Sequence, residues 1–275
     1  MAFIRERTIT IGKYVETDII PRTAAAEIAV RSNRGRKREV SRPAQQNLNN
    51  KNSHRYFTWL LQGNFENGDY YMTYTYKPKF KPKTIGGAQK EIKNWLGRLR
   101  RKAKKTSVEL KYMIVTEFTE EGEAGDISNI HHHVIIKKGL NAEEIIDTWS
   151  KGRGKNREPI GIVHFSLIQS DSDGLLAIAN YLSKQKRWKK GCKSWSSSKN
   201  LNRPFLSIDD HDRDYSKRKV EALALSNDGG EEFFRRKYKN YRITHIECKY
   251  YELTGWHIYL RAWRDSGDDE GGSNQ

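Results

Sequence analysis

Three consecutive histidines lie inside a stretch that predicts a β-strand, Ile130–Lys137. Because successive side chains of a strand point to opposite faces, His131 and His133 share one face, roughly 6–7 Å apart, and His132 points to the other. Two imidazoles at this spacing can bind one metal ion. An isolated pair of this kind is more often a strand edge without a ligand, but three histidines in an apolar strand are costly to bury without partners. The pattern therefore favours a metal site.

A third ligand is expected on the neighbouring strand. Glu117 stands near the end of the predicted strand Leu110–Phe118, and the acidic, glycine-containing segment Glu120–Asn129 follows it. Such a segment is typical of a connection between antiparallel neighbours, so Glu117 should lie beside the histidines. A carboxylate next to two imidazoles suits a hard divalent cation, and the predicted cofactor is Mn²⁺ or Mg²⁺. The alternative for Glu117 is ordinary solvated surface.

A tyrosine and a lysine, Tyr181 and Lys184, stand three residues apart in a predicted helix and therefore share one face. A tyrosine on an amphipathic helix is usually a packing residue. Here a basic stretch with interleaved aromatic rings follows, which is the combination that single-stranded DNA binding requires, although a solvated basic loop is the alternative. The DNA-binding residues predicted from this stretch are Lys186, Arg187, Trp188, Lys189, Lys190, Lys193, Trp195, Lys199 and Arg203.

The elements that must position these residues alternate in type. Residue patterns predict, in chain order, the strand Tyr70–Tyr76, the helix Gly86–Lys104, the strands Leu110–Phe118 and Ile130–Lys137, a short helix capped by Asn141, the strand Gly161–Ile168 and a helix that starts at Asp173. The order β-α-β-β-α-β-α predicts an α+β fold of the ferredoxin-like kind, with a central antiparallel sheet flanked by helices.

Charge and composition divide the remainder of the chain. We expect a basic N-terminal arm over residues 1–42, a main domain over 43–206 that opens with a helix, a C-terminal extension over 207–265 with a β-hairpin, and a disordered acidic tail over 266–275.

The net charge of +17 and the pI of about 9.7 indicate a polyanionic partner. Nucleic acid is favoured over a membrane surface, because no run of about 18 apolar residues and no secretory signal occurs. The two cysteines, Cys192 and Cys248, form no CxxC pair, so neither a disulfide framework nor a cysteine zinc site is expected. These features favour a reduced, cytoplasmic location.

The histidine strand followed by a YxxK helix, Tyr181 to Lys184, resembles the HUH endonuclease superfamily. More closely, the chain is similar to the rolling-circle replication-associated proteins of bacterial plasmids and single-stranded DNA phages, including the gene II-like initiators of filamentous phages. The resemblance spans roughly residues 43–206. The stretches that carry it are Asn64-Phe65, Gly68–Tyr70, Thr73–Tyr76, Lys111–Glu117, the histidine strand, Trp149 with Gly152, Tyr181–Gln185, Ser194-Trp195 and Ser198–Leu201 before Pro204.

This resemblance implies a five-stranded antiparallel sheet, metal ligands at His131 and His133, and a nucleophile at Tyr181. It also implies that Thr73–Tyr76 forms a strand beneath the site, which makes Tyr74 and Tyr76 candidate DNA contacts. The implied activity is nicking and rejoining of single-stranded DNA at an origin through a 5′-phosphotyrosine, with Lys184 favouring the phenolate or holding the phosphate.

The chain departs from relatives with two catalytic tyrosines, since only Tyr181 stands on the helix. No GxxxxGK[ST] motif occurs either, so unwinding is expected to need a host helicase supplied in trans.

Three alternatives remain open at this point. A plasmid relaxase or a single-strand transposase would use the same chemistry on another DNA substrate. A non-catalytic basic nucleic-acid-binding protein would explain the charge without a reaction. A histidine-ligated zinc hydrolase is disfavoured because no HExxH occurs. The lone histidines are expected to play ordinary surface or packing roles; these are His54, His164, His211, His245 and His257.

Overall fold

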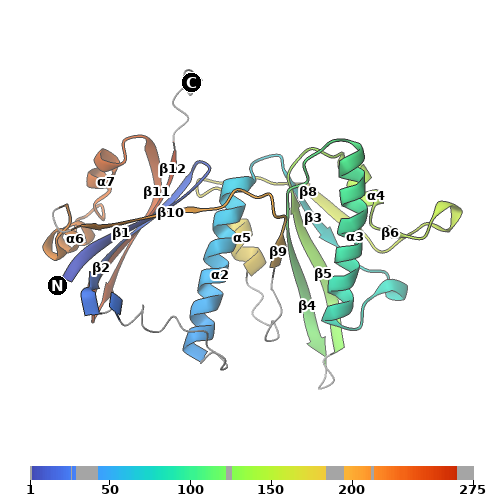
Figure 1. The fold of residues 1–275 in the computed structure, drawn as a ribbon, viewed down its shortest axis with the longest axis horizontal. Coiled ribbons are helices and arrows are strands. Elements are labelled where there is room, and N and C mark those ends of the chain that lie inside the picture. The colour runs from blue at the N-terminus through green and yellow to red at the C-terminus, as the bar shows by residue number, and fades with distance from the viewer. Residues whose placement is uncertain are drawn as a thin grey trace. The chain divides into compact units, whose positions relative to one another are not determined.

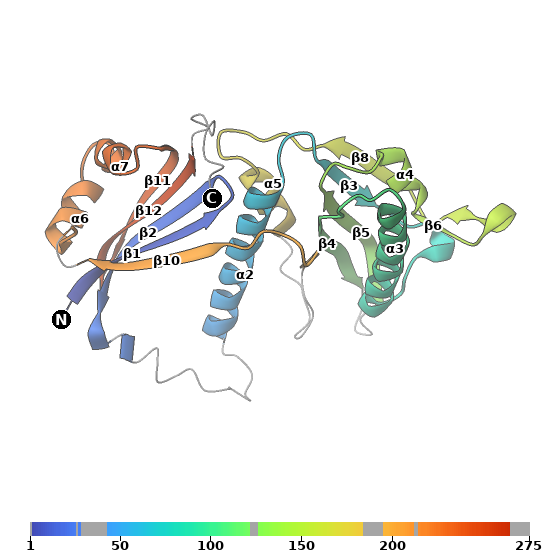
Figure 2. The same ribbon diagram turned by 45° about the horizontal axis from the view of Figure 1, so that its top comes forward.

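The computed structural model describes residues 2–25, 27–28, 43–121, 126–183, 195–211 and 214–264. The chain forms two compact units, drawn in Figures 1 and 2: residues 64–201 make one, and residues 1–63 with 202–275 make the other. The division differs from the predicted one, because the first and last parts of the chain share a sheet. Within the described residues, no helix is long and apolar enough to cross a membrane.

The unit of residues 64–201 is built on a five-stranded antiparallel sheet in the order β8-β3-β5-β4-β9. This confirms the predicted α+β fold with a central antiparallel sheet and flanking helices. The elements in chain order are β3 (Tyr70–Tyr74), α3 (Ile85–Lys105), β4 (Tyr112–Glu121), β5 (Asp126–Ile136), α4 (Ala142–Asp147), β6 (Ser150–Lys151), β7 (Glu158–Pro159), β8 (Val163–Leu167), α5 (Leu176–Ser183) and β9 (Trp195–Ser197). Short 3-10 turns lie at Pro78–Phe80 and Gly154–Asn156.

One face of this sheet is covered by α3 and α4. The apolar stripe of α3 recurs at helical spacing, and it packs against alternate residues of the three central strands. At the centre, the Tyr74 ring lies 4.6 Å from Trp95 and 5.1 Å from Trp149 between ring centroids. Thr84 caps the start of α3 by accepting a hydrogen bond from the Gly87 amide, and Asn141 caps α4 in the same way from Glu143. The two caps fix where these helices begin.

The opposite face carries the intervening residues of the same strands, and α5 lies on that side (Figure 1). His133 and Thr73 are direct neighbours across β5 and β3, and Val115 faces His133 from β4. The sheet therefore separates two environments: a dry core under α3, and a partly open face next to α5.

The second unit has its own antiparallel sheet, in the order β10-β1-β2-β12-β11. Its elements are β1 (Ala2–Ile11), β2 (Tyr14–Thr23), α2 (Pro43–Asn64), β10 (Phe205–His211), α6 (Lys217–Ala224), α7 (Glu231–Lys237), β11 (Tyr241–Tyr251) and β12 (Gly255–Arg264). The predicted C-terminal hairpin is present as β11 and β12. The predicted basic arm of residues 1–42 instead contains β1 and β2, because their alternating apolar residues pack on α6 and α7.

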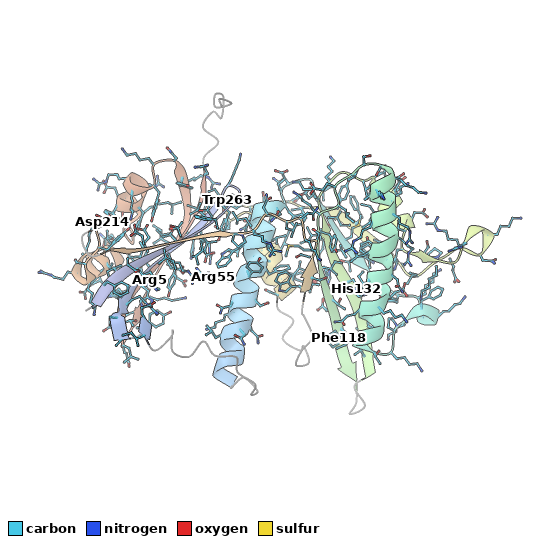
Figure 3. The ribbon with its side chains drawn as sticks, viewed as in Figure 1. Arg5, Arg55, Phe118, His132, Asp214 and Trp263 are labelled. Atoms are coloured by element: carbon cyan, nitrogen blue, oxygen red, sulfur yellow. The ribbon has the colours of Figure 1, made fainter. Side chains whose placement is uncertain are left out.

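The other face of this sheet carries an ion-pair cluster with α2. The guanidinium of Arg55, labelled in Figure 3, binds the carboxylates of Glu16 and Asp18, and Trp59 donates to Glu16 over 2.8 Å. These contacts hold α2 against β2 within its own unit.

Candidate active site

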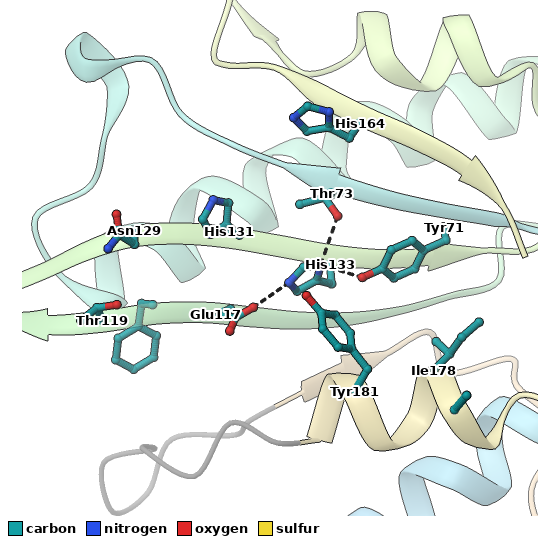
Figure 4. Close-up of a pocket in the computed structure, with 12 residues that line it drawn as sticks. Tyr71, Thr73, Glu117, Thr119, Asn129, His131, His133, His164, Ile178 and Tyr181 are labelled. Carbon is teal, nitrogen blue, oxygen red and sulfur yellow. Dashed lines mark hydrogen bonds and ion pairs between the residues drawn. The ribbon is translucent and has the colours of Figure 1, made fainter.

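His133 is the centre of a hydrogen-bonded cluster on the open face of the sheet (Figure 4). Its Nε2 lies 2.9 Å from Glu117 Oε2, and its Nδ1 lies 2.9 Å from the Tyr71 hydroxyl and 3.1 Å from the Thr73 hydroxyl. A carboxylate only accepts hydrogen bonds, so Nε2 carries the proton and Nδ1 accepts from the hydroxyls. Side chains of the two neighbouring strands, β3 and β4, thus fix the ring of His133.

The electrostatics of the cluster favour the neutral form of His133. Burial lowers the pKa of His133, although the hydrogen bond to Glu117 opposes the shift. Burial also raises the pKa of Tyr71 to about 12, so its hydroxyl keeps its proton and can donate to Nδ1. The Tyr71 and His133 rings are stacked, with an interplanar angle of 9°.

His132 points to the other face of the sheet, as the alternation predicts. It is fully buried under Trp149, and its two nitrogens bond to hydroxyls: Nε2 to Tyr76 at 2.6 Å and Nδ1 to Thr116 at 2.9 Å. Burial lowers the pKa of His132 to about 3, so it is neutral at physiological pH. Its role is therefore structural, and it lies away from the open face.

A β-bulge lies two residues before His131. The β4–β5 register passes from Glu117 opposite His131 to Thr119 opposite Ser128, so β5 contains one extra residue at Asn129 and Ile130. Asn129 has a φ of +46°, in the left-handed region that asparagine tolerates better than most residues. Bulges redirect side chains and recur next to active sites. In this one Ile130 turns to the α3 side while His131 stays on the open face.

Tyr181 lies on α5 and faces this cluster. Its side chain is 56% exposed, and its ring meets the His133 ring edge-on, with 5.8 Å between centroids. Figure 4 shows the hydroxyl of Tyr181 pointing from α5 toward His133. The helix itself is anchored by its buried residues Ala179 and Leu182. The phenol is therefore open to a ligand and directed at the histidine cluster.

These side chains line one pocket, which also contains two residues of interest that sequence reasoning missed. His164 of β8 faces Thr73 directly in the register and enters the pocket from the edge strand. The sequence suggests only an ordinary surface or packing role for it, because alternation alone does not say which face of its strand meets the histidines. Asn129 lines the same pocket from the bulge.

The predicted metal ligands are only partly gathered. Glu117 and His133 are in contact and His131 lines the same pocket. In the described part of the chain, however, no group of three or more His, Cys, Asp or Glu side chains is placed to hold a metal ion. The donor chemistry still fits a divalent cation at Glu117 and His133: two adjacent ligands of one ion at about 2.1 Å lie about 3 Å apart, close to the 2.9 Å between these two atoms.

Two of the predicted DNA contacts require correction. Tyr74 has no exposed surface, because even-numbered residues of β3 face the core under α3. Tyr76 is half-buried and directs its hydroxyl to His132. Neither ring can stack on a base without leaving the core.

The other predicted contacts lie in different places. Trp195 lies on the edge strand β9, half-buried, and Lys199 is exposed just beyond it. Arg203 is exposed in the other unit and donates to Tyr56 over 3.2 Å. Lys184, Lys186, Arg187, Trp188, Lys189, Lys190 and Lys193 lie outside the described residues.

Comparison with known proteins identifies the unit that carries this site. No curated protein and no solved structure gives a significant match to the chain. Residues 69–199 match the model of a family of replication-associated proteins, the ORF2 and gene II protein family. That match covers nearly the whole unit of residues 64–201, including the histidine strand and Tyr181. Residues 69–199, within this unit, are thus similar to a family of replication-associated proteins.

Proposed function

We propose that this protein initiates rolling-circle replication by nicking and rejoining single-stranded DNA at an origin, with Tyr181 as the nucleophile. The observation that carries the proposal is the exposed phenol of Tyr181 directed at a histidine that is itself bonded to a carboxylate. The family match favours this role over a relaxase or a transposase with the same chemistry.

His133, Glu117 and His131 are the residues that would hold a divalent ion. Two of them are already at the separation of neighbouring ligands, and a new side-chain rotamer of His131, on the same face of β5, would complete the set. When bound, Mn²⁺ or Mg²⁺ would neutralise charge on the scissile phosphate and orient it for attack.

The remaining steps, orientation of His133 and attack on the phosphate, are carried out by residues of the chain itself. With an ion bound, His133 Nε2 would give up its proton to coordinate, and Nδ1 would carry the proton and donate to the hydroxyls of Tyr71 and Thr73, which orient the ring as the partners of metal-binding histidines commonly do. Tyr181 attacks phosphorus, and its phenol proton passes to solvent, to which the side chain is open. A Tyr181 oxygen–phosphorus bond forms as the bond from phosphorus to the 3′-oxygen breaks, and that oxygen leaves as a hydroxyl after gaining a proton.

The phosphotyrosine conserves the energy of the broken bond, so attack by a 3′-hydroxyl can rejoin the strand without another energy source. This reversibility favours a tyrosine over an activated water for a replication cycle that must close the nick. We further propose that a host helicase in the bacterial cytoplasm unwinds the duplex.

Incubation with a single-stranded origin oligonucleotide, labelled at the 3′ end, and Mn²⁺ tests the proposal. Denaturing electrophoresis should show the labelled 3′ part of the oligonucleotide attached to the protein through its 5′-phosphate. Tyr181→Phe should abolish this adduct, whereas the control Tyr250→Phe, at another exposed tyrosine, should not. Excess chelator should also abolish it.

Adduct formation by Tyr181→Phe would remove Tyr181 from the reaction. Full cleavage in excess chelator would show that the reaction needs no metal ion. Binding of the oligonucleotide without any adduct, under all metal conditions, would instead support a non-catalytic DNA-binding protein.

A further inference from the structure

The outward face of α3 is strongly basic and lies on the side of the sheet away from the candidate active site. Four exposed cations follow it at helical spacing: Lys90, Lys93, Arg101 and Lys104. None of them forms an ion pair with a described residue. The only carboxylate of the helix, Glu91, is buried and is held by Arg98 and Lys151. We call these four residues, with Gly97 between them, the basic face of α3.

This arrangement is unfavourable for the helix itself. Lys90 with Lys93 and Arg101 with Lys104 are like charges three residues apart, a spacing at which they repel. A surface that served only solubility would mix acids among these cations and gain pairs at the same positions. The charge pattern therefore indicates a binding partner that supplies negative charge.

Gly97 gives a second, independent indication that another molecule binds to this face of α3. A Cβ at this position would meet nothing within 4 Å, so no neighbour in its unit requires a glycine. Glycine in the middle of a helix is less stable than alanine. The absence of a side chain between Lys93 and Arg101 lets another molecule approach the helix backbone closely.

The partner that fits is duplex DNA rather than a single strand. Binding of single strands relies on aromatic rings that stack on bases, and the one aromatic residue of α3, Trp95, is fully buried. From Lys90 to Lys104 the helix rises about 21 Å, enough to reach the phosphates on both sides of a major groove about 12 Å wide.

We propose that the basic face of α3 is a second DNA-binding surface, which binds the phosphate backbone of duplex DNA while the pocket on the other face of the sheet takes a single strand. The two surfaces are separated by the sheet, which lies between α3 and α5 (Figure 1). Helix α3 packs over the side of His132, and the pocket opens on the side of His133. A duplex on α3 and a single strand at Tyr181 can therefore be held together without competing.

The test compares the full-length variant K90Q/K93Q/R101Q/K104Q with a control, K81Q/K138Q/R153Q/K155Q, which removes the same charge from exposed positions of the same unit. Each lost phosphate contact lowers the slope of log K against log salt by about 0.9, so the α3 variant should lose roughly 3–4 units of slope on a duplex. The control should lose less than one unit. Adduct formation on a single-stranded oligonucleotide should stay within about twofold of wild type.

Gly97→Gln provides a variant that leaves the charge unchanged. It should raise the thermal midpoint, because glutamine is a better helix former, and lower duplex affinity several-fold. Equal losses in the α3 variant and its control would overturn the proposal, as would equal losses on duplex and single-stranded DNA. Failure of Tyr181 to form an adduct would leave the duplex measurements unchanged, so the two proposals fail separately.

Discussion

Replacement of Asn129 by valine should loosen the pairing of β4 with β5, whereas replacement by glycine should not. Asn129 has a φ of +46° at the bulge, where its Cβ lies in the left-handed region. That conformation costs most residues about 1–2 kcal/mol; glycine adopts it freely, and asparagine tolerates it. Valine adds a branch at Cβ, so the full penalty should apply to Asn129→Val and little of it to Asn129→Gly.

A penalty of about 1–2 kcal/mol changes an opening equilibrium about 5- to 30-fold. Amide hydrogen exchange measured by mass spectrometry reports this opening in β4 and β5 directly, without interference from unfolding of the other unit. The amides of Ile130–Ile136 should exchange about 5- to 30-fold faster in Asn129→Val and within about twofold of wild type in Asn129→Gly.

Equal exchange in the two variants would refute this reasoning, because the left-handed backbone would then place no demand on residue 129. Faster exchange in the glycine variant than in the valine variant would show that the asparagine side chain, rather than its backbone conformation, stabilises the bulge. Exchange in β1 and β2 serves as the internal control and should not change.

Two further predictions concern the two histidine faces. His132→Phe leaves the hydroxyls of Tyr76 and Thr116 without their imidazole partner, so it should lower the free energy of unfolding by about 1–3 kcal/mol in denaturant titrations. Adduct formation at low temperature should persist. A stably folded variant that formed no adduct would contradict the structural role of His132. Tyr71→Phe removes one of the two hydroxyls on His133 Nδ1, so Mn²⁺ affinity, measured by calorimetry, should fall about 10-fold or more. An unchanged affinity would show that Thr73 alone orients the ring.

Much of the main unit is predictable because its signals are local. The helical spacing of Ile92, Trp95 and Leu99 predicts α3, and the Asn141 cap predicts the start of α4. The alternation of the histidine strand separates His131 and His133 from His132. A connection of few residues between β4 and β5 makes them antiparallel neighbours, and this places Glu117 next to the histidines.

Other features depend on pairings that lie far apart in the chain. Strands β1 and β2 pair with each other locally, but their outer neighbours β10 and β12 come about 200 residues or more later in the chain. The rest of this sheet therefore has no local signal, and the sequence alone predicts an arm there. The prediction for Tyr74 is wrong because tyrosines occupy both faces of β3, at Tyr70 and Tyr74 on one side and Tyr71 on the other. Without a polar contrast between the faces, periodicity cannot say which tyrosines are buried.

The candidate ligands and the candidate nucleophile differ in how firmly they are held. His133 stands on β5, which is hydrogen-bonded on both sides to β3 and β4, whereas Tyr181 stands near the end of a helix of eight residues. Short helices owe their stability to packing rather than to their own hydrogen bonds. A covalently attached DNA end would therefore move with an adjustable helix above a rigid platform. Small tilts of α5 could then withdraw the attached end and later return it for ligation, while the candidate ligands Glu117 and His133 keep their places.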